Sequence, residues 1–598
     1  MSDPYLDDAP EGRFRPGFLR ELWPFVHPYR RGFVACMAVL ACSMGLELLG
    51  PWLVRLAVDG PMRDAGADQD SRLSSLWLFG GAFLAVTAAG ALLGYVYGLL
   101  TAWNGQRVIR DVRRRVFAHV LSLGLEFHER NPAGKLTTRV TSDVENLNEL
   151  ISTGVLQTFF DLLKLIGIVA ALFFLDPGLA LFTLATTPAL VALSVVFRRK
   201  AQVAYRAVRS RLALQNAFAT ELLGGARTTR AYGMEAAVEA RYAERNAATT
   251  DAWRDTVLHF STFFSLVDFA LRATSVGLLW FGGQAVLGGE LQPGQFIQFW
   301  LYFTMLSGPI RALGEVYNVL QAAFASCERI FQLLAEPSFP GAPPPGREVS
   351  PCPRRGVAEV TFEDVRFAYG DGPAVLEQVS FTARPGETVA IVGPTGAGKT
   401  TLLSLVARLR DVDAGRVQVD GADVRDVDLS ELRRRVAYVA QDLFLFTGTV
   451  LENVRLFDPS IPEADVWRAL ETVGADGFVR ALPDGIQAEV AERGATFSQG
   501  ERQLLAFARA LVRDPDLLVL DEATASIDSD AEARLQRALA ATLRGRTALV
   551  VAHRLSTVRG ADQILVLEGG RVTERGTHEQ LLARGGHYAR MTALAAAR

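Results

Sequence analysis

Six long apolar runs constrain this 598-residue chain more than any other feature of its sequence. The runs cover, approximately, residues 33–59, 76–103, 152–175, 178–197, 257–287 and 295–322. Each is close to or above the ~20 residues that a helix needs to cross a bilayer. We therefore expect an α-helical membrane domain with six transmembrane helices. Six crossings also place both ends of this region on the same side of the membrane.

Basic residues predict which side that is. Arginine and lysine gather in the connections on one face of the membrane, at residues 30–31, 107–115, 198–200 and 206–230. The connections on the other face, at residues 61–74, 176–178 and 288–294, are short. Positive charge marks the cytoplasmic side. We expect a multi-pass protein of the cell inner (cytoplasmic) membrane, with both termini in the cytoplasm. The N-terminal residues lack the pattern of a cleaved signal peptide.

Two cytoplasmic connections are unusually long, with about 45 residues between the second and third spans and about 55 between the fourth and fifth. Both have a helical composition. At 1.5 Å per residue, each half of such a connection extends its span roughly 30 Å beyond the membrane. Proline and glycine interrupt the helical pattern at residues 127–134 and 224–232, which predicts turns there.

Several charged residues lie inside the predicted spans, namely Glu47, Asp161, Lys164, Asp268, Arg272, Arg311 and Glu315. Charges at membrane depth are costly and usually face a bundle interior or a water-filled path. For Asp268 with Arg272, and for Arg311 with Glu315, two interpretations remain open: an ion pair within one helix, or part of a substrate path. The depth of Glu47 favours the path interpretation.

A proline-rich stretch at residues 334–356 separates two regions of different composition. Such a stretch is a semi-rigid linker. We therefore divide the chain into an N-terminal interfacial segment (1–31), a transmembrane domain (32–333), the linker (334–356) and a soluble α/β domain (357–598).

The soluble domain contains a glycine-rich stretch between an apolar run at 389–392 and another at 402–406. Its residues are Gly393, Pro394, Thr395, Gly396, Ala397, Gly398, Lys399, Thr400 and Thr401. The pattern G-x-x-x-x-G-K-T between a strand and a helix is that of a P-loop, whose backbone N–H groups and helix N-terminus surround phosphates. Lys399 is then expected to contact the β- and γ-phosphates, and Thr400 to bind Mg²⁺. The predicted cofactors are ATP and Mg²⁺.

A second apolar strand, at residues 517–520, ends in Asp521 and Glu522. A P-loop fold needs an acidic residue at such a strand end for Mg²⁺, which suits Asp521. Glu522 is placed to orient and deprotonate the attacking water. The alternative is that Glu522 is only a solvated carboxylate at the strand end.

With these motifs in order, the second half of the chain resembles the nucleotide-binding domain of ATP-binding cassette proteins. The whole chain resembles their exporter half-transporters. The resemblance implies that Tyr369 stacks on adenine and that Gln441, in the Q-loop, senses Mg²⁺ and the membrane domain. It also implies that Asp528 belongs to the D-loop and that His553 is the switch histidine that contacts the γ-phosphate.

The signature sequence of this family, L-S-G-G-Q, is altered here to Phe497-Ser498-Gln499-Gly500-Glu501. Ser498 and Gly500 are kept, and in the family they contact a γ-phosphate held by the opposite chain. Gln499 replaces a glycine where a phosphate must approach closely, and Glu501 adds negative charge. This departure is similar to one half of bacterial heterodimeric exporters, so we expect a non-identical partner subunit. The alternative is a variant that a homodimer tolerates.

The resemblance implies ATP-driven efflux of lipophilic compounds by alternating access, which makes the chain an ATP hydrolase coupled to transport. The alternatives are a homodimeric lipid flippase or peptide exporter, and an ATP-gated channel or regulatory subunit. The expected partners are the second subunit, the lipid bilayer and a lipophilic, lipid or peptide substrate. A formal net charge of −3 argues against nucleic acid as a partner.

Overall fold

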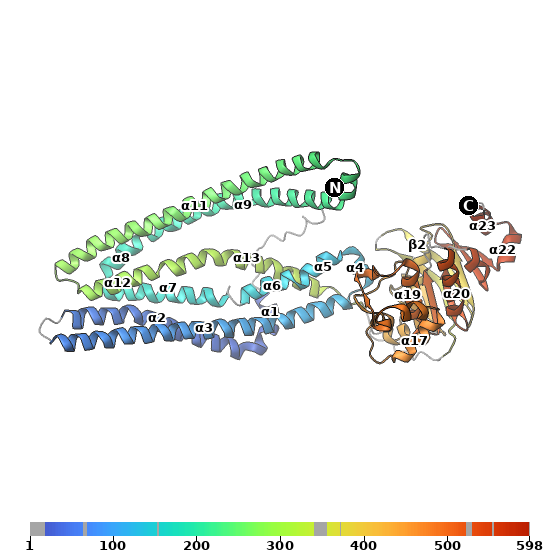
Figure 1. Ribbon diagram of the computed structural model, residues 1–598, viewed down its shortest axis with the longest axis horizontal. Coiled ribbons are helices and arrows are strands. Elements are labelled where there is room, and N and C mark those ends of the chain that lie inside the picture. The colour runs from blue at the N-terminus through green and yellow to red at the C-terminus, as the bar shows by residue number, and fades with distance from the viewer. Residues whose placement is uncertain are drawn as a thin grey trace. The chain divides into compact units, whose positions relative to one another are not determined.

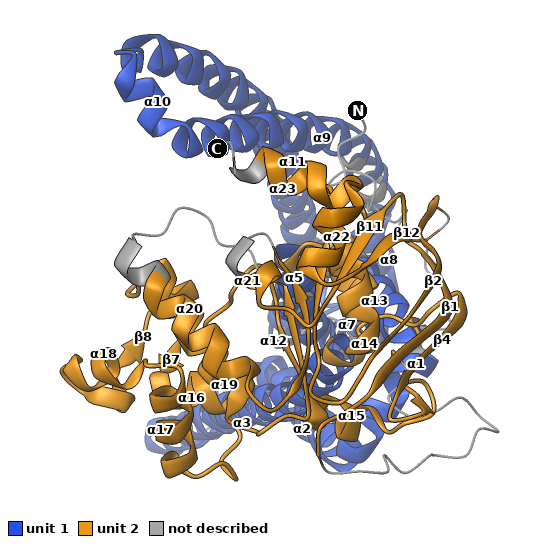
Figure 2. Ribbon diagram, turned by 90° about the vertical axis from the view of Figure 1, so that its right-hand side faces the viewer, with its two compact units in different colours: residues 1–120, 134–335 blue, residues 121–133, 336–598 orange. Residues whose placement is uncertain are grey.

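A computed structural model describes residues 18–63, 68–151, 155–339, 356–370, 372–521, 529–552 and 555–596. The chain forms two compact units, shown in blue and orange in Figure 2. Unit 1 comprises residues 1–120 and 134–335. Unit 2 comprises residues 121–133 and 336–598, so a short piece of the first half of the chain groups with the second half.

Unit 1 is built from helices (Figure 1). They are α1 (Phe18–Val26), η1 (His27–Tyr29), α2 (Arg30–Ala57), η2 (Val58–Met62), α3 (Gln69–Ser122), α5 (Ala133–Val140), α6 (Ser142–Glu149), α7 (Val155–Leu175), α8 (Pro177–Ala185), α9 (Thr187–Gly224), α10 (Ala226–Ala231), α11 (Glu235–Leu287), α12 (Pro293–Met305) and α13 (Ser307–Ala335). Helix α3 has 54 residues and α11 has 53. At 1.5 Å per residue each is about 80 Å long, far more than a bilayer requires. The second and fifth predicted spans therefore do continue as helices into their long connections.

Within the described residues, four helical segments are individually long and apolar enough to cross a membrane: Arg20–Met62, Gln69–Ser122, Gln157–Leu175 and Glu235–Leu287. The predicted fourth span falls on α8 and α9, and the predicted sixth falls on α12 and α13. The helices break at Thr186 and Leu306. Pro188 and Pro309 follow each break, and proline has no N–H to donate to the preceding turn. The count of six crossings remains a prediction.

The charged residues inside the predicted spans have partners where the structure describes their side chains. Lys164 Nζ of α7 lies 2.5 Å from Glu47 Oε1 of α2, so the Glu47 carboxylate is paired with a neighbouring helix. Arg272 Nε lies 2.7 Å from Asp268 Oδ2, one turn away on α11. The side chains of Arg311 and Glu315 lie outside the described residues. A role of Glu47, Asp268 or Arg272 in a substrate path remains a prediction.

A buried ionic cluster joins α6 to α13 within unit 1. Asp143 Oδ2 accepts hydrogen bonds from Arg139 Nη1 at 2.9 Å and Arg329 Nε at 3.0 Å, and Asp143 Oδ1 accepts one from Ser326 Oγ at 2.9 Å. Burial raises the pKa of Asp143, but the hydrogen bonds from Arg329 and Arg139 outweigh it, so the pKa lies below its ordinary value. Asp143 is thus held as a carboxylate between two guanidinium groups.

Replacing Asp143 by alanine should destabilise unit 1 by about 3–5 kcal/mol, because two arginines would lose their buried partner. A lowered pKa means that the stabilisation is fully present above the ordinary value of 3.8 and is lost as the pH falls below it. Thermal unfolding in detergent at pH 7 measures the effect. Asp251→Ala, on an exposed position of α11, is the matched control. Equal unfolding midpoints for the two variants would contradict this assignment.

Unit 2 contains two main sheets and a two-stranded one of β7 (Gly448–Thr449) and β8 (Glu489–Val490). The antiparallel sheet has the order β2-β1-β4-β5, with β1 (Val360–Ala368), β2 (Ala374–Ala383), β4 (Ala414–Val419) and β5 (Ala422–Asp423). The six-stranded sheet has the order β12-β11-β3-β10-β9-β6, with β3 (Thr388–Val392), β6 (Val436–Val439), β9 (Leu517–Asp521), β10 (Thr547–Val551), β11 (Gln563–Glu568) and β12 (Arg571–Gly576). All pairings in it are parallel except that of β12.

The parallel strands are buried on both faces, which explains why they read as continuous apolar runs. Alternate residues of β3 enter two different cores: Val389 and Ile391 pack on one face, and Ala390 and Val392 on the other. The helices of unit 2 are α4 (Leu125–Arg130), α14 (Lys399–Val406), α15 (Leu429–Arg435), α16 (Val450–Arg455), α17 (Glu463–Thr472), α18 (Asp476–Ala481), α19 (Gln499–Leu511), α20 (Ser529–Leu543), α21 (Leu555–Arg559), α22 (His578–Arg584) and α23 (His587–Ala596), with short turns η4 (Gly485–Gln487) and η5 (Glu492–Gly494). The predicted α/β domain is therefore present.

Candidate functional site

The glycine-rich stretch forms the turn between β3 and α14, as the sequence predicts. Two of its glycines are required by their surroundings. A Cβ at Gly393 would lie 2.1 Å from the carbonyl oxygen of Leu567, and Gly398 has φ 95° with a would-be Cβ 2.8 Å from Leu376 Cδ2. The turn consequently packs closely against the sheet. Pro394, Thr395 and Gly396 are exposed, as is Thr400, whereas Ala397 and Thr401 are buried.

Lys399, at the start of α14, lies across this turn. Its Nζ donates hydrogen bonds to the carbonyl oxygens of Gly393 at 2.9 Å and Pro394 at 2.8 Å. Burial lowers the pKa of Lys399, and the Asp521 carboxylate partly opposes that shift. The ammonium group is thus held at the phosphate-binding turn by two carbonyls, which phosphate oxygens can replace. An ammonium group at a glycine-rich turn fits the phosphates of a nucleoside triphosphate.

The register of the parallel sheet places the ends of three strands side by side. In β10, which lies between β3 and β9, Val551 pairs with Ile391 on one side and with Asp521 on the other. Asp521 is 5% exposed, at the last position of β9. Ligands of open α/β sheets bind at this carboxyl edge. Glu522 directly follows β9 and His553 lies two positions after β10, but both lie outside the described residues, as does Asp528.

Gln441 and Asp521 line the same small cavity, of about 20 Å³, together with Gln503 and apolar side chains. A space of this size holds about one water. No group of three His, Cys, Asp or Glu side chains forms a metal site in the described parts of the chain. Mg²⁺ at such sites is held by one or two protein groups together with substrate phosphates. Thr400 and Asp521, with Gln441 beside Asp521, are the residues that would hold it here.

Tyr369 lies at the end of β1, next to the phosphate-binding turn. Its hydroxyl is 2.7 Å from Thr401 Oγ1, and its ring packs edge-on against Phe367 at 5.1 Å between centroids. The residue is 44% exposed. An exposed aromatic ring held in this way is a suitable platform for a base.

The altered signature sequence begins helix α19. Ser498 is its N-cap, and Glu501 closes a capping box with it. Glu501 Oε2 accepts hydrogen bonds from the backbone N and from Oγ of Ser498, both at 2.8 Å. Ser498 is exposed and Gly500 is buried. The serine hydroxyl that the family uses for phosphate therefore donates to a carboxylate of its own chain.

One neighbour of this site was missed by sequence reasoning. Arg410, in the turn after α14, lies with its Cζ 4.7 Å from the centroid of the Tyr369 ring. It also forms an ion pair with Glu129 of α4. The two residues are 281 positions apart, so no local pattern indicates their pairing.

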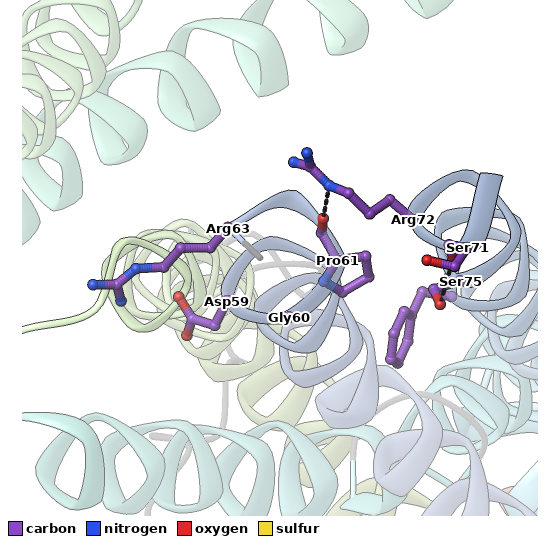
Figure 3. Close-up of a pocket in the computed structure, with 8 residues that line it drawn as sticks. Asp59, Gly60, Pro61, Arg63, Ser71, Arg72 and Ser75 are labelled. Atoms are coloured by element: carbon purple, nitrogen blue, oxygen red, sulfur yellow. Dashed lines mark hydrogen bonds between the residues drawn. The ribbon is translucent and has the colours of Figure 1, made fainter. Parts of the chain in front are cut away.

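A hollow of about 420 Å³ lies in unit 1, where η2 approaches the start of α3 (Figure 3). Arg72 crosses it, and its Nε donates to the carbonyl oxygen of Pro61 at 2.8 Å. Asp59, on its other side, accepts a hydrogen bond from the backbone N of Gly294 at 2.7 Å. These contacts tie the ends of helices together. The hollow contains none of the nucleotide-site residues predicted from the sequence.

Comparison with known proteins agrees with this fold. The family described as "ABC transporter transmembrane region" matches residues 33–310, and the family "ABC transporter" matches residues 376–525. The chain is 39% identical over 497 residues to the "Probable multidrug resistance ABC transporter ATP-binding/permease protein YheH" of Bacillus subtilis, covering 82% of this chain and 73% of the relative. It is 32% identical over 579 residues to an "ATP-dependent lipid A-core flippase" of Syntrophus aciditrophicus, covering 97% and 94%.

Among solved structures, the chain is similar to a "bacterial Atm1-family ABC exporter with ATP bound". The TM-score is 0.77 at 28% sequence identity, covering 95% of this chain and 99% of that one. The chain therefore belongs to the ATP-binding cassette transporters, as a half-transporter that fuses a membrane region to a nucleotide-binding domain. It is an exporter that binds ATP and couples its hydrolysis to transport. The fold and family expected from the sequence are confirmed.

Proposed function

We propose that this chain is one half of a heterodimeric exporter that moves lipophilic compounds out across the cytoplasmic membrane, with its nucleotide-binding domain and both termini inside. The altered signature at 497–501 is the observation that carries the proposal. The Ser498 hydroxyl already donates a hydrogen bond to the Glu501 carboxylate, so this chain offers a weak phosphate site to its partner. The strand end with Asp521 and Glu522 is kept, so this chain's own P-loop site is suited to hydrolysis. Because the facing subunit supplies the signature sequence for that site, we infer a different subunit whose signature is intact.

In this proposal ATP, with Mg²⁺ at Thr400 and Asp521, binds between two facing nucleotide-binding domains. Glu522 orients the attacking water, and His553 and Asp528 complete the site. A switch from 1:99 to 99:1 between inward- and outward-facing states needs about 5.5 kcal/mol of differential binding. Charge-assisted hydrogen bonds contribute about 1.5–3 kcal/mol each, so two interfacial ATP molecules are sufficient.

The heterodimer is tested by the native mass of the complex extracted in detergent from its source membrane. We expect one 65.0 kDa chain bound to a different subunit. Two copies of this chain would overturn the heterodimer and make both ATP sites equivalent. The outcome does not depend on which substrate is exported.

Replacing Glu501 by glutamine should strengthen ATP binding, by about two- to fivefold, at the site that this chain's signature forms with the partner's P-loop. Glutamine keeps the capping box, but the variant lacks the negative charge beside the phosphate site. A charge near a helix N-terminus is worth about 0.3–1 kcal/mol, which gives this factor. The difference should shrink at high salt.

Glu452→Gln is the matched control, because Glu452 closes an equivalent capping box with Thr449 at α16. The control should bind ATP at that site like the parent. If Glu501→Gln also behaves like the parent, the Glu501 charge does not weaken the signature.

A lipid flippase is the second candidate, and the similarity to the lipid A-core flippase favours it. The two candidates differ in what stimulates hydrolysis. Lipophilic dyes should raise the ATPase rate of a drug exporter in vesicles of fixed composition. A flippase should respond to the lipid composition and not to the dye.

A further inference from the structure

A hollow at one end of unit 1 contains the two basic residues of the predicted outer connections. These connections are residues 61–74, 176–178 and 288–294, and Arg63 and Arg72 are the only lysines or arginines in them. Both line the hollow of about 420 Å³ between η2 and the start of α3 (Figure 3). Lysine and arginine are normally concentrated in the cytoplasmic connections of membrane proteins. Two arginines at one outer hollow therefore indicate a local role for positive charge.

Arg72 is held in place without losing its charge. Its Nε donates to the carbonyl oxygen of Pro61 and its Nη2 donates to that of Met62, both at 2.8 Å. Pro61 and Met62 belong to η2, so the guanidinium of this α3 residue is anchored across the hollow. Both acceptors are neutral, and a guanidinium has five N–H donors. Positive charge and N–H donors therefore remain for an anion.

The carboxylate that lines the hollow does not cancel this charge. Asp59 Oδ1 accepts a hydrogen bond from the backbone N of Gly294 at 2.7 Å, and Asp59 Oδ2 lies 3.5 Å from Arg55 Nε. The charge of Asp59 is thus compensated by Arg55. Asp68 and Asp70, on either side of the first residue of α3, are not among the described residues that line the hollow. The two arginines of the hollow therefore make it a site for a negative charge.

Large apolar side chains are exposed on the elements that form the hollow. Trp77 of α3 is 81% exposed, Leu73 one turn earlier is 47% exposed, and Met62 at the end of η2 is 53% exposed. Tryptophan is enriched at the membrane–water interface, where lipid headgroups lie. Phe79 lines the hollow itself. A ligand in the hollow thus meets cationic and apolar side chains together, which suits a lipid with a negatively charged headgroup.

We propose that this hollow binds the phosphate group of an anionic phospholipid of the outer leaflet, with Arg63 and Arg72 as its ligands. A volume of about 420 Å³ lies within the range of small-molecule sites. The headgroup bridges η2 and α3, and the acyl chains lie along the exposed apolar residues of α3. The inference goes beyond the proposed function, because it holds whichever compound is exported. It rests on the predicted topology, which places residues 61–74 outside.

The experiment uses the exporter purified in detergent with any partner subunit it retains. Native mass spectrometry measures its affinity for phosphatidylglycerol, which has a net negative charge, and for phosphatidylcholine, whose choline offsets the phosphate. Inorganic phosphate is then added in excess as a competitor. The parent should bind phosphatidylglycerol at least about fivefold more tightly than phosphatidylcholine. Inorganic phosphate should not displace the lipid, because it has no acyl chains to contact the apolar residues.

Arg63→Gln is the main variant, because Arg63 is exposed and its replacement should leave the fold intact. It should weaken phosphatidylglycerol binding about fivefold, the contribution of one basic residue at an anionic membrane surface. Replacing Arg72 by glutamine as well should bring the loss to about 25-fold. Arg63→Lys keeps the charge and should bind within about twofold of the parent. Arg468→Gln, at an exposed position of α17 in unit 2, is the matched control and should bind like the parent.

The side of the membrane is tested separately. Ser74 is exposed on α3 and is not among the residues that line the hollow. In intact spheroplasts, Ser74→Cys should react with a membrane-impermeant maleimide, and the parent should not. Labelling of Ser74→Cys in inside-out vesicles but not in spheroplasts would overturn the outer-leaflet assignment.

Three results of the binding measurements would also overturn the inference. The first is that Arg63→Gln binds phosphatidylglycerol as tightly as the parent and the control. The second is that phosphatidylcholine binds the parent as tightly as phosphatidylglycerol, so that the net charge of the lipid is not recognised. The third is that inorganic phosphate displaces the lipid, which would make the hollow a site for a free anion. If the double variant unfolds at a lower temperature than the parent, because Arg72 also holds Pro61 and Met62, Arg63→Gln alone decides.

Discussion

Replacing Glu522 by glutamine should reduce ATP hydrolysis by about 10²- to 10⁴-fold, the contribution typical of a positioned general base. ATP binding should change little, because glutamine has the same shape and the phosphate contacts are made by other residues. The chain order supports this role, since Glu522 directly follows Asp521 at the carboxyl edge of the sheet. The rate of phosphate release and the affinity for ATP, measured on the same preparation, check the two parts of the prediction.

Glu290→Gln is the control for this substitution. Glu290 is exposed in the short loop between α11 and α12, on the face predicted to lie outside the cell. The control should hydrolyse ATP at the parent rate. A Glu522→Gln exporter that hydrolyses ATP as fast as this control would show that the carboxylate is only a solvated group at the strand end.

Replacing Lys399 by alanine should weaken ATP binding by about 10²- to 10⁴-fold. The ammonium group is expected to contact two phosphates, and charge-assisted hydrogen bonds contribute about 1.5–3 kcal/mol each. Each 1.4 kcal/mol corresponds to about a factor of ten in affinity. The lysine already lies at the turn, held by the carbonyl oxygens of Gly393 and Pro394. Equilibrium binding of a fluorescent ATP analogue measures the loss.

Lys200→Ala, at an exposed position of α9, is the control for charge removal. It should bind ATP like the parent. The Lys399→Ala protein must also unfold at nearly the parent temperature, so that lost binding is not lost folding. Parent-like affinity for ATP in Lys399→Ala would contradict the assignment of the phosphate site.

Local patterns predicted the nucleotide-binding unit well, because its chemistry is encoded in short segments. The turn from Gly393 to Lys399 needs glycines where β11 and β2 approach it closely. The flanking strand β3 and helix α14 are apolar because both are packed in the hydrophobic core. The position of Asp521 follows from the same logic, since a buried strand that ends in a carboxylate marks the ligand edge of a parallel sheet. Glu522 follows β9 and His553 follows β10 in the chain, but both lie outside the described residues, so their roles remain predictions.

Long-range pairs could not be predicted. Glu47 and Lys164 were both recognised as charges at membrane depth, but nothing in the sequence links positions 117 residues apart. The same holds for Glu129 and Arg410, and for Asp143 and Arg329. Such pairs are fixed by how helices pack, which apolar periodicity does not determine. The helix breaks at Thr186 and Leu306 were missed for another reason: the apolar runs continue through them although prolines follow.

The central claim is that ATP hydrolysis by this chain drives export. The most direct test is ATP-dependent accumulation of a lipophilic dye in inside-out membrane vesicles that carry the parent exporter or the Glu522→Gln variant. We predict accumulation by the parent only when ATP and Mg²⁺ are supplied, and none by the variant. Equal accumulation by both, or accumulation without ATP, would contradict the claim.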